Sequence, residues 1–126
     1  MKAVAIRGAV TVENNEAEEI KSATLSMVEQ IIEKNQFLRE DIIMVFMTMT
    51  ADLTAFTASS AIRLGMDWHD VPFFTSLEPN IEGGLKKCIR VLIQVQSQKA
   101  KHEINHVYLG EAAKLRPDLN PQLSDK

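Results

Sequence analysis

Hydrophobic positions recur at two different periods along the chain, and the change of period separates a long helix from the strands around it. Between residues 15 and 35, apolar side chains return every three or four positions, which predicts one amphipathic helix. Its apolar stripe consists of Ile20, Ala23, Met27, Val28, Ile31 and Ile32. Asn15 followed by Glu18 has the spacing of a capping box and predicts the start of the helix, and Asn35 predicts its end.

The remaining apolar segments predict five β-strands. Residues 3–12 form a β-rich run interrupted by Gly8, where a strand can bulge or admit a close neighbour. Residues 41–50 are apolar on both faces, which is typical of a central strand. The other three strands are predicted at residues 71–76, 87–95 and 106–109.

The order of these elements predicts an α+β fold, in which a five-stranded mixed sheet is covered on one face by the long helix and a short helix at residues 57–65. One long helix is too little to cover both faces, and the segment at residues 41–50 favours burial on both sides. We therefore expect the second face to meet another subunit. Residues 1–126 are expected to form a single domain, with a mobile tail from about residue 115.

Composition and charge narrow the class of protein. Fourteen Lys and Arg against 17 Asp and Glu give a net charge of −3, which argues against nucleic-acid binding. No uncharged apolar run approaches the roughly 18 residues of a membrane span, and Arg7 interrupts the first apolar run, so neither a membrane segment nor a signal peptide is expected. We expect a cytoplasmic protein. Seven acids between residues 13 and 40 mark the solvated side of the long helix.

Familiar catalytic and cofactor motifs are missing from the sequence, including nucleotide-binding glycine loops and the HExxH and CxxC motifs. His102 and His106 have the spacing of a helical ligand pair but lie beside a predicted strand, so we expect no metal site. Cys88 shares a strand face with Arg90, which favours a thiolate, but a free cysteine in an apolar strand is more often a core residue. We expect no cofactor.

Arginines stand at unusual positions. Arg7 and Arg90 lie inside predicted strands, Arg63 lies on the short helix, and Arg116 precedes a proline in the tail. Each arginine taken alone is explained by solvent exposure or by an ion pair with an acid such as Glu78. Two guanidinium groups on one small sheet, however, are costly to desolvate unless an anion meets them. The residues therefore predict an anion-binding cleft suited to a small dicarboxylate, without identifying that ligand.

Four segments carry a family resemblance: residues 5–13 (AIRGAVTVE), 83–91 (GGLKKCIRV), 106–109 (HVYL) and 115–119 (LRPDL). Together they resemble the monofunctional bacterial chorismate mutases of the homotrimeric type, and the resemblance runs nearly end to end. It implies a trimeric pseudo-α/β-barrel with active sites at the subunit interfaces. The implied reaction is the Claisen rearrangement of chorismate to prephenate, on the route to phenylalanine and tyrosine, with no cofactor or metal.

The resemblance also implies roles for individual residues. Arg90 would donate to the ether oxygen, where negative charge gathers as the C–O bond breaks, and Glu78 would accept the ring hydroxyl proton. Arg7 and Tyr108 would hold carboxylates of the substrate. The other expected pocket residues are Thr57, Ser60, Arg63, Phe74, Thr75, Leu115 and Arg116. Among them, Phe74 is assigned by strand alternation, which places one of two adjacent phenylalanines in the core and the other in the pocket wall.

Three positions depart from many relatives: Thr57 stands where an aromatic residue is common, Ser60 where a lysine is common, and Thr75 where some members have cysteine. The changes at Thr57 and Ser60 predict weaker substrate binding. One alternative function is a non-catalytic trimeric sensor that binds an aromatic-pathway carboxylate through Arg7 and Arg63. Another is a trimeric enamine or imine hydrolase of similar barrel architecture, whose motifs the sequence does not match.

Overall fold

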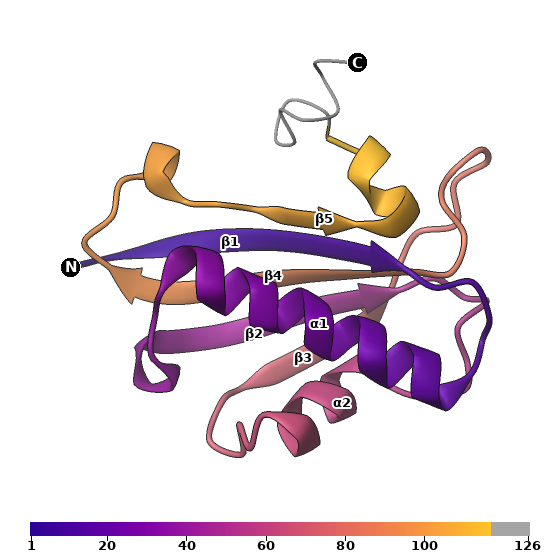
Figure 1. The fold of residues 1–126 in the computed structure, drawn as a ribbon, viewed down its shortest axis with the longest axis horizontal. Coiled ribbons are helices and arrows are strands. Elements are labelled where there is room, and N and C mark those ends of the chain that lie inside the picture. Colours follow the sequence, from indigo (N-terminus) through magenta and orange to yellow (C-terminus); the bar gives the residue numbers. More distant parts are fainter. Residues whose placement is uncertain (117–126) are drawn as a thin grey trace.

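The computed structural model describes residues 1–116, and Figure 1 shows a twisted sheet with both α-helices on one face. The α-helices and strands are β1 (Lys2–Thr11), α1 (Ala17–Asn35), β2 (Ile42–Met49), α2 (Ala58–Gly65), β3 (Phe73–Leu77), β4 (Cys88–Ser97) and β5 (Val107–Leu109). Short 3-10 helices are η1 (Arg39–Asp41), η2 (Lys101–Glu103) and η3 (Gly110–Lys114). None of these helices is long and apolar enough to cross a membrane.

The strands lie in the order β3-β2-β4-β1-β5. Pairs β1–β4 and β2–β4 are antiparallel, whereas β1–β5 and β2–β3 are parallel. This confirms the predicted α+β fold with a five-stranded mixed sheet, one long helix and one short helix. The expected tail from about residue 115 lies, from residue 117 onward, outside the described residues.

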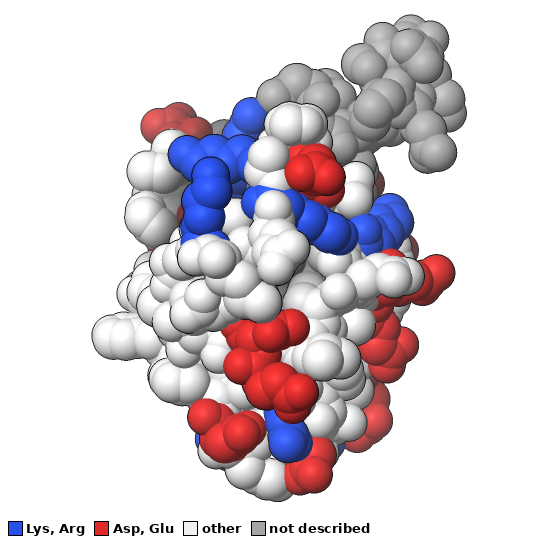
Figure 2. Space-filling model, turned by 90° about the vertical axis from the view of Figure 1, so that its left-hand side faces the viewer, with Lys and Arg blue, Asp and Glu red and all other residues white. Residues whose placement is uncertain are grey.

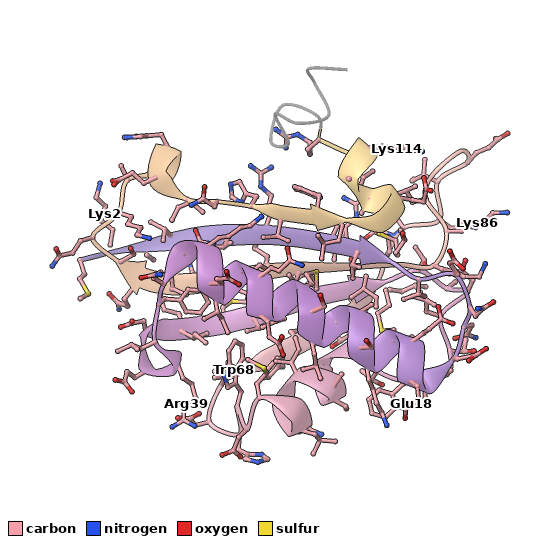
Figure 3. All side chains as sticks on the ribbon, viewed as in Figure 1. Lys2, Glu18, Arg39, Trp68, Lys86 and Lys114 are labelled. Atoms are coloured by element: carbon pink, nitrogen blue, oxygen red, sulfur yellow. The ribbon has the colours of Figure 1, made fainter. Side chains whose placement is uncertain are left out.

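The face of the sheet beneath the helices carries the main hydrophobic core. On β4 the alternation places Ile89, Val91, Ile93 and Val95 on this face, each at most 4% exposed. From α1, the predicted stripe contributes Ile20, Met27, Val28 and Ile31, all fully buried. Trp68, which follows α2 and is labelled in Figure 3, is buried in the same cluster. Burial of this continuous apolar surface fixes α1 and α2 against the sheet.

Gly8 marks the closest approach between β1 and α1. A Cβ atom added at Gly8 would lie 2.8 Å from Cδ1 of Ile31 and 3.0 Å from Cγ1 of Val91. The register of β1 with β4 is continuous through this position, so the glycine serves close packing and not a bulge. Because Gly8 faces α1, strand alternation turns its neighbours Arg7 and Ala9 toward the open face of the sheet.

The start of α1 differs from the predicted capping box. The helix begins at Ala17, and the Asn15 side chain binds elsewhere: its Oδ1 accepts the backbone N–H groups of Thr54 and Ala55, both at 3.0 Å. Glu19 reaches back instead and accepts the N–H groups of the two residues before Asn15. Asn15 therefore fastens the loop before α2, a contact between segments distant in sequence that the local pattern does not contain.

The predicted end of α1 at Asn35 is confirmed, and the buried Asn35 side chain also holds the approach to β5. Its Nδ2 donates to the carbonyl of Asn105 and its Oδ1 accepts the N–H of Asn105, both at 2.8 Å. This pair of bonds closes a ring between the end of α1 and the residue two positions before β5. The position of β5 at the edge of the sheet is thus tied to the helix.

Candidate active site

The open face of the sheet carries most of the side chains that could bind a substrate or take part in catalysis. One row across the five strands, in spatial order from β5 to β3, consists of Tyr108, Ala9, Arg90, Thr48 and Ser76. A second row contains Arg7 on β1, Leu92 on β4, Phe46 on β2 and Phe74 on β3. The strand register alone thus places the two strand arginines on adjacent strands of one face.

Four of the predicted site residues line one cavity. Arg7, Glu78, Arg90 and Tyr108 surround a space of about 220 Å³, together with Gly8, Phe46, Thr48, Val91 and Leu92. A second hollow of about 520 Å³ adjoins this cavity, shares Glu78 and Arg90 with it, and is bordered by residues 79–86. We call the first space the arginine cavity.

Glu78 is held at the edge of the arginine cavity by three contacts. Its backbone N–H donates to the carbonyl of Met49 at 2.9 Å, which extends the pairing of β2 with β3. Its Oε1 lies 3.5 Å from Nε of Arg90 and accepts a hydrogen bond from the Thr48 hydroxyl. The Arg90 side chain remains 44% exposed, so this ion pair is partly solvated and leaves guanidinium N–H groups for another anion.

Tyr108 belongs to a small second core on the open face. It packs with Ala9, Cys88 and Ala112, and Leu115 packs against the same cluster. Cys88 is 2% exposed, and burial raises the pKa of its thiol despite the opposing charge of Arg90. Cys88 is therefore a core residue, as predicted, while Leu115 packs against the cluster that contains Tyr108 and does not itself line the arginine cavity.

Among the side chains that line the arginine cavity, two arginines lie with one glutamate, so the local charge is positive although the net charge of the chain is −3. Figure 2 faces the end of the molecule where β1 begins; basic side chains gather in its upper part, toward β5, with some acidic ones among them, and acidic side chains predominate in its lower part. Arg7 also lines a hollow of about 680 Å³ with Lys101, His102 and His106. Burial, and then the charges of Arg7 and Arg116, lower the pKa of His106.

The other predicted pocket residues lie apart from the arginine cavity. Thr57, Ser60 and Thr75 line a separate hollow of about 670 Å³ beside α2 and β3, which we call the threonine hollow. The two spaces share no lining residue. Arg63 is exposed on α2, and Phe74 is 60% exposed on the open face, where it stacks on Phe46 at 5.7 Å between ring centroids.

The structure adds two residues that the sequence analysis did not assign to the site. Thr48 binds Glu78, and His106 accepts the backbone N–H of Arg7 through Nδ1 at 2.9 Å. Alternation along β2 places Thr48 on the open face, but its position beside Arg90 depends on the register with β4. Within residues 1–116, no three His, Cys, Asp or Glu side chains gather closely enough to hold a metal ion.

Comparisons with known proteins identify the family of the chain. The family described as chorismate mutase type I matches residues 3–119. The chorismate mutase AroH of Bacillus subtilis (strain 168) is 43% identical over 115 residues, 91% of each chain. The AroH of Thermus thermophilus is 40% identical over 116 residues, 90% of this chain and 93% of its own.

Comparison of the fold with solved structures indicates the same family. A solved structure of a chorismate mutase from Clostridium thermocellum matches with a TM-score of 0.85 and 40% identity, covering 88% of this chain and 98% of that chain. The chain therefore belongs to the chorismate mutase type I family and is an isomerase.

Proposed function

We propose that the arginine cavity is where this chorismate mutase converts chorismate to prephenate. The observation that carries the proposal is the convergence of two guanidinium groups, one carboxylate and one phenol on a single cavity, from β1, β4, β5 and the segment after β3. The reaction rearranges one molecule and needs no nucleophile. It needs a site that binds a dianion and stabilises negative charge on an ether oxygen. Guanidinium and phenol groups can bind the carboxylates, and a guanidinium can also stabilise the charge on the ether oxygen.

Arg90 is assigned the central catalytic role. As the C–O bond breaks, negative charge collects on the ether oxygen, and a cationic donor already in place lowers the energy of that transition state. The pairing of Arg90 with Glu78 restrains its guanidinium while leaving it 44% exposed, so it is both positioned and accessible. One preorganised donor of this kind typically contributes ~3–4 kcal/mol.

Arg7, Tyr108 and Glu78 are assigned to binding and conformational restraint. Arg7 and Tyr108 project from neighbouring strands of the open face and are suited to hold a substrate carboxylate. Glu78 already receives Thr48 and Arg90 at Oε1, which leaves Oε2 to accept the substrate hydroxyl. Contacts at both ends of the substrate hold it in its compact, reactive conformer.

The proposal includes a second chain at each active site. Thr57, Ser60, Thr75 and Arg63 do not reach the arginine cavity of their own chain, yet the family resemblance assigns them to the pocket. The open face also exposes apolar side chains, with Phe74 60% and Leu92 40% exposed. A homotrimer would cover these side chains and bring the threonine hollow of one chain against the arginine cavity of the next.

Two experiments test the proposal. Purified protein is incubated with chorismate while absorbance is followed and the product is identified; persistence of chorismate, or a product other than prephenate, would support the sensor or hydrolase alternative. The Arg90→Gln and Arg63→Ala variants are then refolded together. If each site needs Arg90 from one chain and Arg63 from the next, about a quarter of the sites in an equimolar mixture regain both residues. Unchanged activity after mixing would place both residues of a site in one chain.

A further inference from the structure

His106 directly precedes β5 and continues the row that contains Arg7 toward that strand. In the parallel pairing of β1 with β5, Gly8 lies opposite Val107. The preceding residues, Arg7 and His106, therefore also lie opposite one another. Here the imidazole replaces a strand carbonyl: the backbone N–H of Arg7 donates to Nδ1 of His106 at 2.9 Å. On its other side Arg7 is paired with Leu92 of β4. The Arg7 backbone is thus held between a main-chain ladder and one side chain.

The surroundings of His106 favour the neutral imidazole that this contact requires. The ring is half-buried, and its charged neighbours are the guanidinium groups of Arg7 and Arg116. Lys101 and His102 line the same hollow, and none of the carboxylates within residues 1–116 lines it. A neutral ring that accepts at Nδ1 carries its proton on Nε2. Protonation would turn the acceptor into a donor facing the Arg7 N–H and would add a positive charge beside these cations.

We propose that His106 is a positioning residue that fixes the strand from which Arg7 reaches the substrate, and that it does so only in its neutral form. The inference rests on the proposed function of Arg7 in binding a substrate carboxylate. Loss of the Nδ1 acceptor leaves the half-buried Arg7 N–H without its partner and loosens the end of the β1–β5 pairing. Ground-state binding then weakens more than the rearrangement step, which depends on Arg90.

Three substitutions separate the acceptor from the rest of the ring. The amide oxygen of His106→Asn stands near the place of Nδ1, the oxygen of His106→Gln lies farther out, and His106→Leu has no acceptor. We expect KM to rise about threefold to tenfold in the Leu and Gln variants and to remain near the wild-type value in the Asn variant. His102→Asn is the matched control, because His102 lines the same hollow without binding Arg7, and its KM should not change.

The pH profile supplies a readout that a merely structural role would not move. The KM of the wild-type enzyme should rise as pH falls through the lowered pKa of His106, whereas His106→Asn has no such limb. A KM that rises identically in His106→Asn would overturn the proposal, even if His106→Leu fails to fold. So would a wild-type KM that stays constant down to the pH at which His106 is shown by NMR to be protonated.

The NMR measurement also separates this proposal from the proposed function. Nitrogen-15 shifts of the imidazole at neutral pH should show the proton on Nε2; a proton on Nδ1 would overturn the role of His106 whatever the kinetics. Arg7→Ala reports on the function alone. If Arg7→Ala leaves KM unchanged, the assignment of Arg7 to the substrate fails. If Arg7→Ala raises KM but His106→Leu does not, that assignment holds and the positioning role of His106 is wrong.

Discussion

The two faces of the sheet differ in what their side chains do, even between adjacent residues of one strand. On β4, Ile93 is fully buried beneath the helices, whereas Leu92 beside it is 40% exposed on the open face. The covered face contains buried apolar side chains in one continuous cluster, and the open face contains Arg7, Thr48 and Arg90 around a cavity. Stability is concentrated on one face and chemistry on the other, so substitutions on the two faces should have separable effects.

The largest expected effect comes from removing the charge of Arg90 on the open face. Arg90→Gln preserves most of the side-chain length but loses the cationic donor, and kcat should fall about 10²- to 10³-fold. The unfolding free energy should change by no more than about 0.5 kcal/mol, because the ion pair with Glu78 is partly solvated. Steady-state kinetics and urea unfolding measure the two quantities on the same sample.

Binding provides the control for this variant. A stable dicarboxylate resembling the substrate should still bind to Arg90→Gln, since Arg7 and Tyr108 remain in place. A large loss of folding stability with kcat preserved would reverse the assignment of the two faces. Arg90→Lys should recover part of kcat, because lysine restores the charge without the planar arrangement of donors.

The second effect contrasts Ile93→Ala with Leu92→Ala. Truncation of the fully buried Ile93 should lower the unfolding free energy by about 2–5 kcal/mol, through lost burial and an unfilled cavity. The single tryptophan, Trp68, is buried in the same core and reports unfolding by its fluorescence. Leu92→Ala should cost much less in a dissociated chain and should instead weaken subunit association, visible as greater dependence on protein concentration. Equal losses independent of concentration would show that the open face is not an interface.

Substitutions at Thr48 test whether the hydrogen bond from Thr48 to Glu78 is needed for activity. Thr48→Val keeps the shape but removes the donor to Glu78, and hydrogen bonds to charged groups contribute about 1.5–3 kcal/mol, so kcat/KM should fall about tenfold to 150-fold. Thr48→Ser retains the hydroxyl and should restore most of the activity. The matched control is Thr24→Val on α1: the buried Thr24 Oγ1 finds no hydrogen-bond partner among the described residues, so this variant should keep full activity and equal or higher stability. An active Thr48→Val would mean that Glu78 needs no support.

The covered face could be predicted from local pattern, and the open face only in part. The apolar stripe of α1 and the alternation of β4 depend on periods of 3.6 and 2 that any core-facing element repeats. The arginines were recognisable as unusual because charged residues are rare inside strands. Local pattern does not show that the arginines converge with Tyr108. That convergence requires Ala9 to pair with β4 on one side and β5 on the other, some 80 to 100 residues away. Only the family resemblance indicates it.

Two local predictions fail or fall short for the same physical reason. Asn15 was predicted to cap α1, but its side chain binds the loop before α2, about 40 residues away. The sequence pattern places Thr48 in an apolar strand, whereas its role depends on Glu78, 30 residues away. A short polar side chain has several partners of similar energy within reach, and the folded arrangement of distant segments decides among them.

The smallest expected effect concerns the threonine hollow, where Ser60 stands in place of a commonly basic residue. Ser60→Lys adds a cation to a half-buried position on α2, and exposed charge pairs contribute about 0.2–1 kcal/mol, so KM should fall by up to about fivefold with kcat unchanged. The gain should shrink as salt approaches ~1 M, where the screening length is ~3 Å. Ser60→Gln, similar in bulk but uncharged, should leave KM near the wild-type value. Because Ser60 lies outside the arginine cavity of its own chain, a salt-sensitive gain in Ser60→Lys would support a site in which the threonine hollow lies near the bound substrate, and an unchanged KM would separate the threonine hollow from the active site.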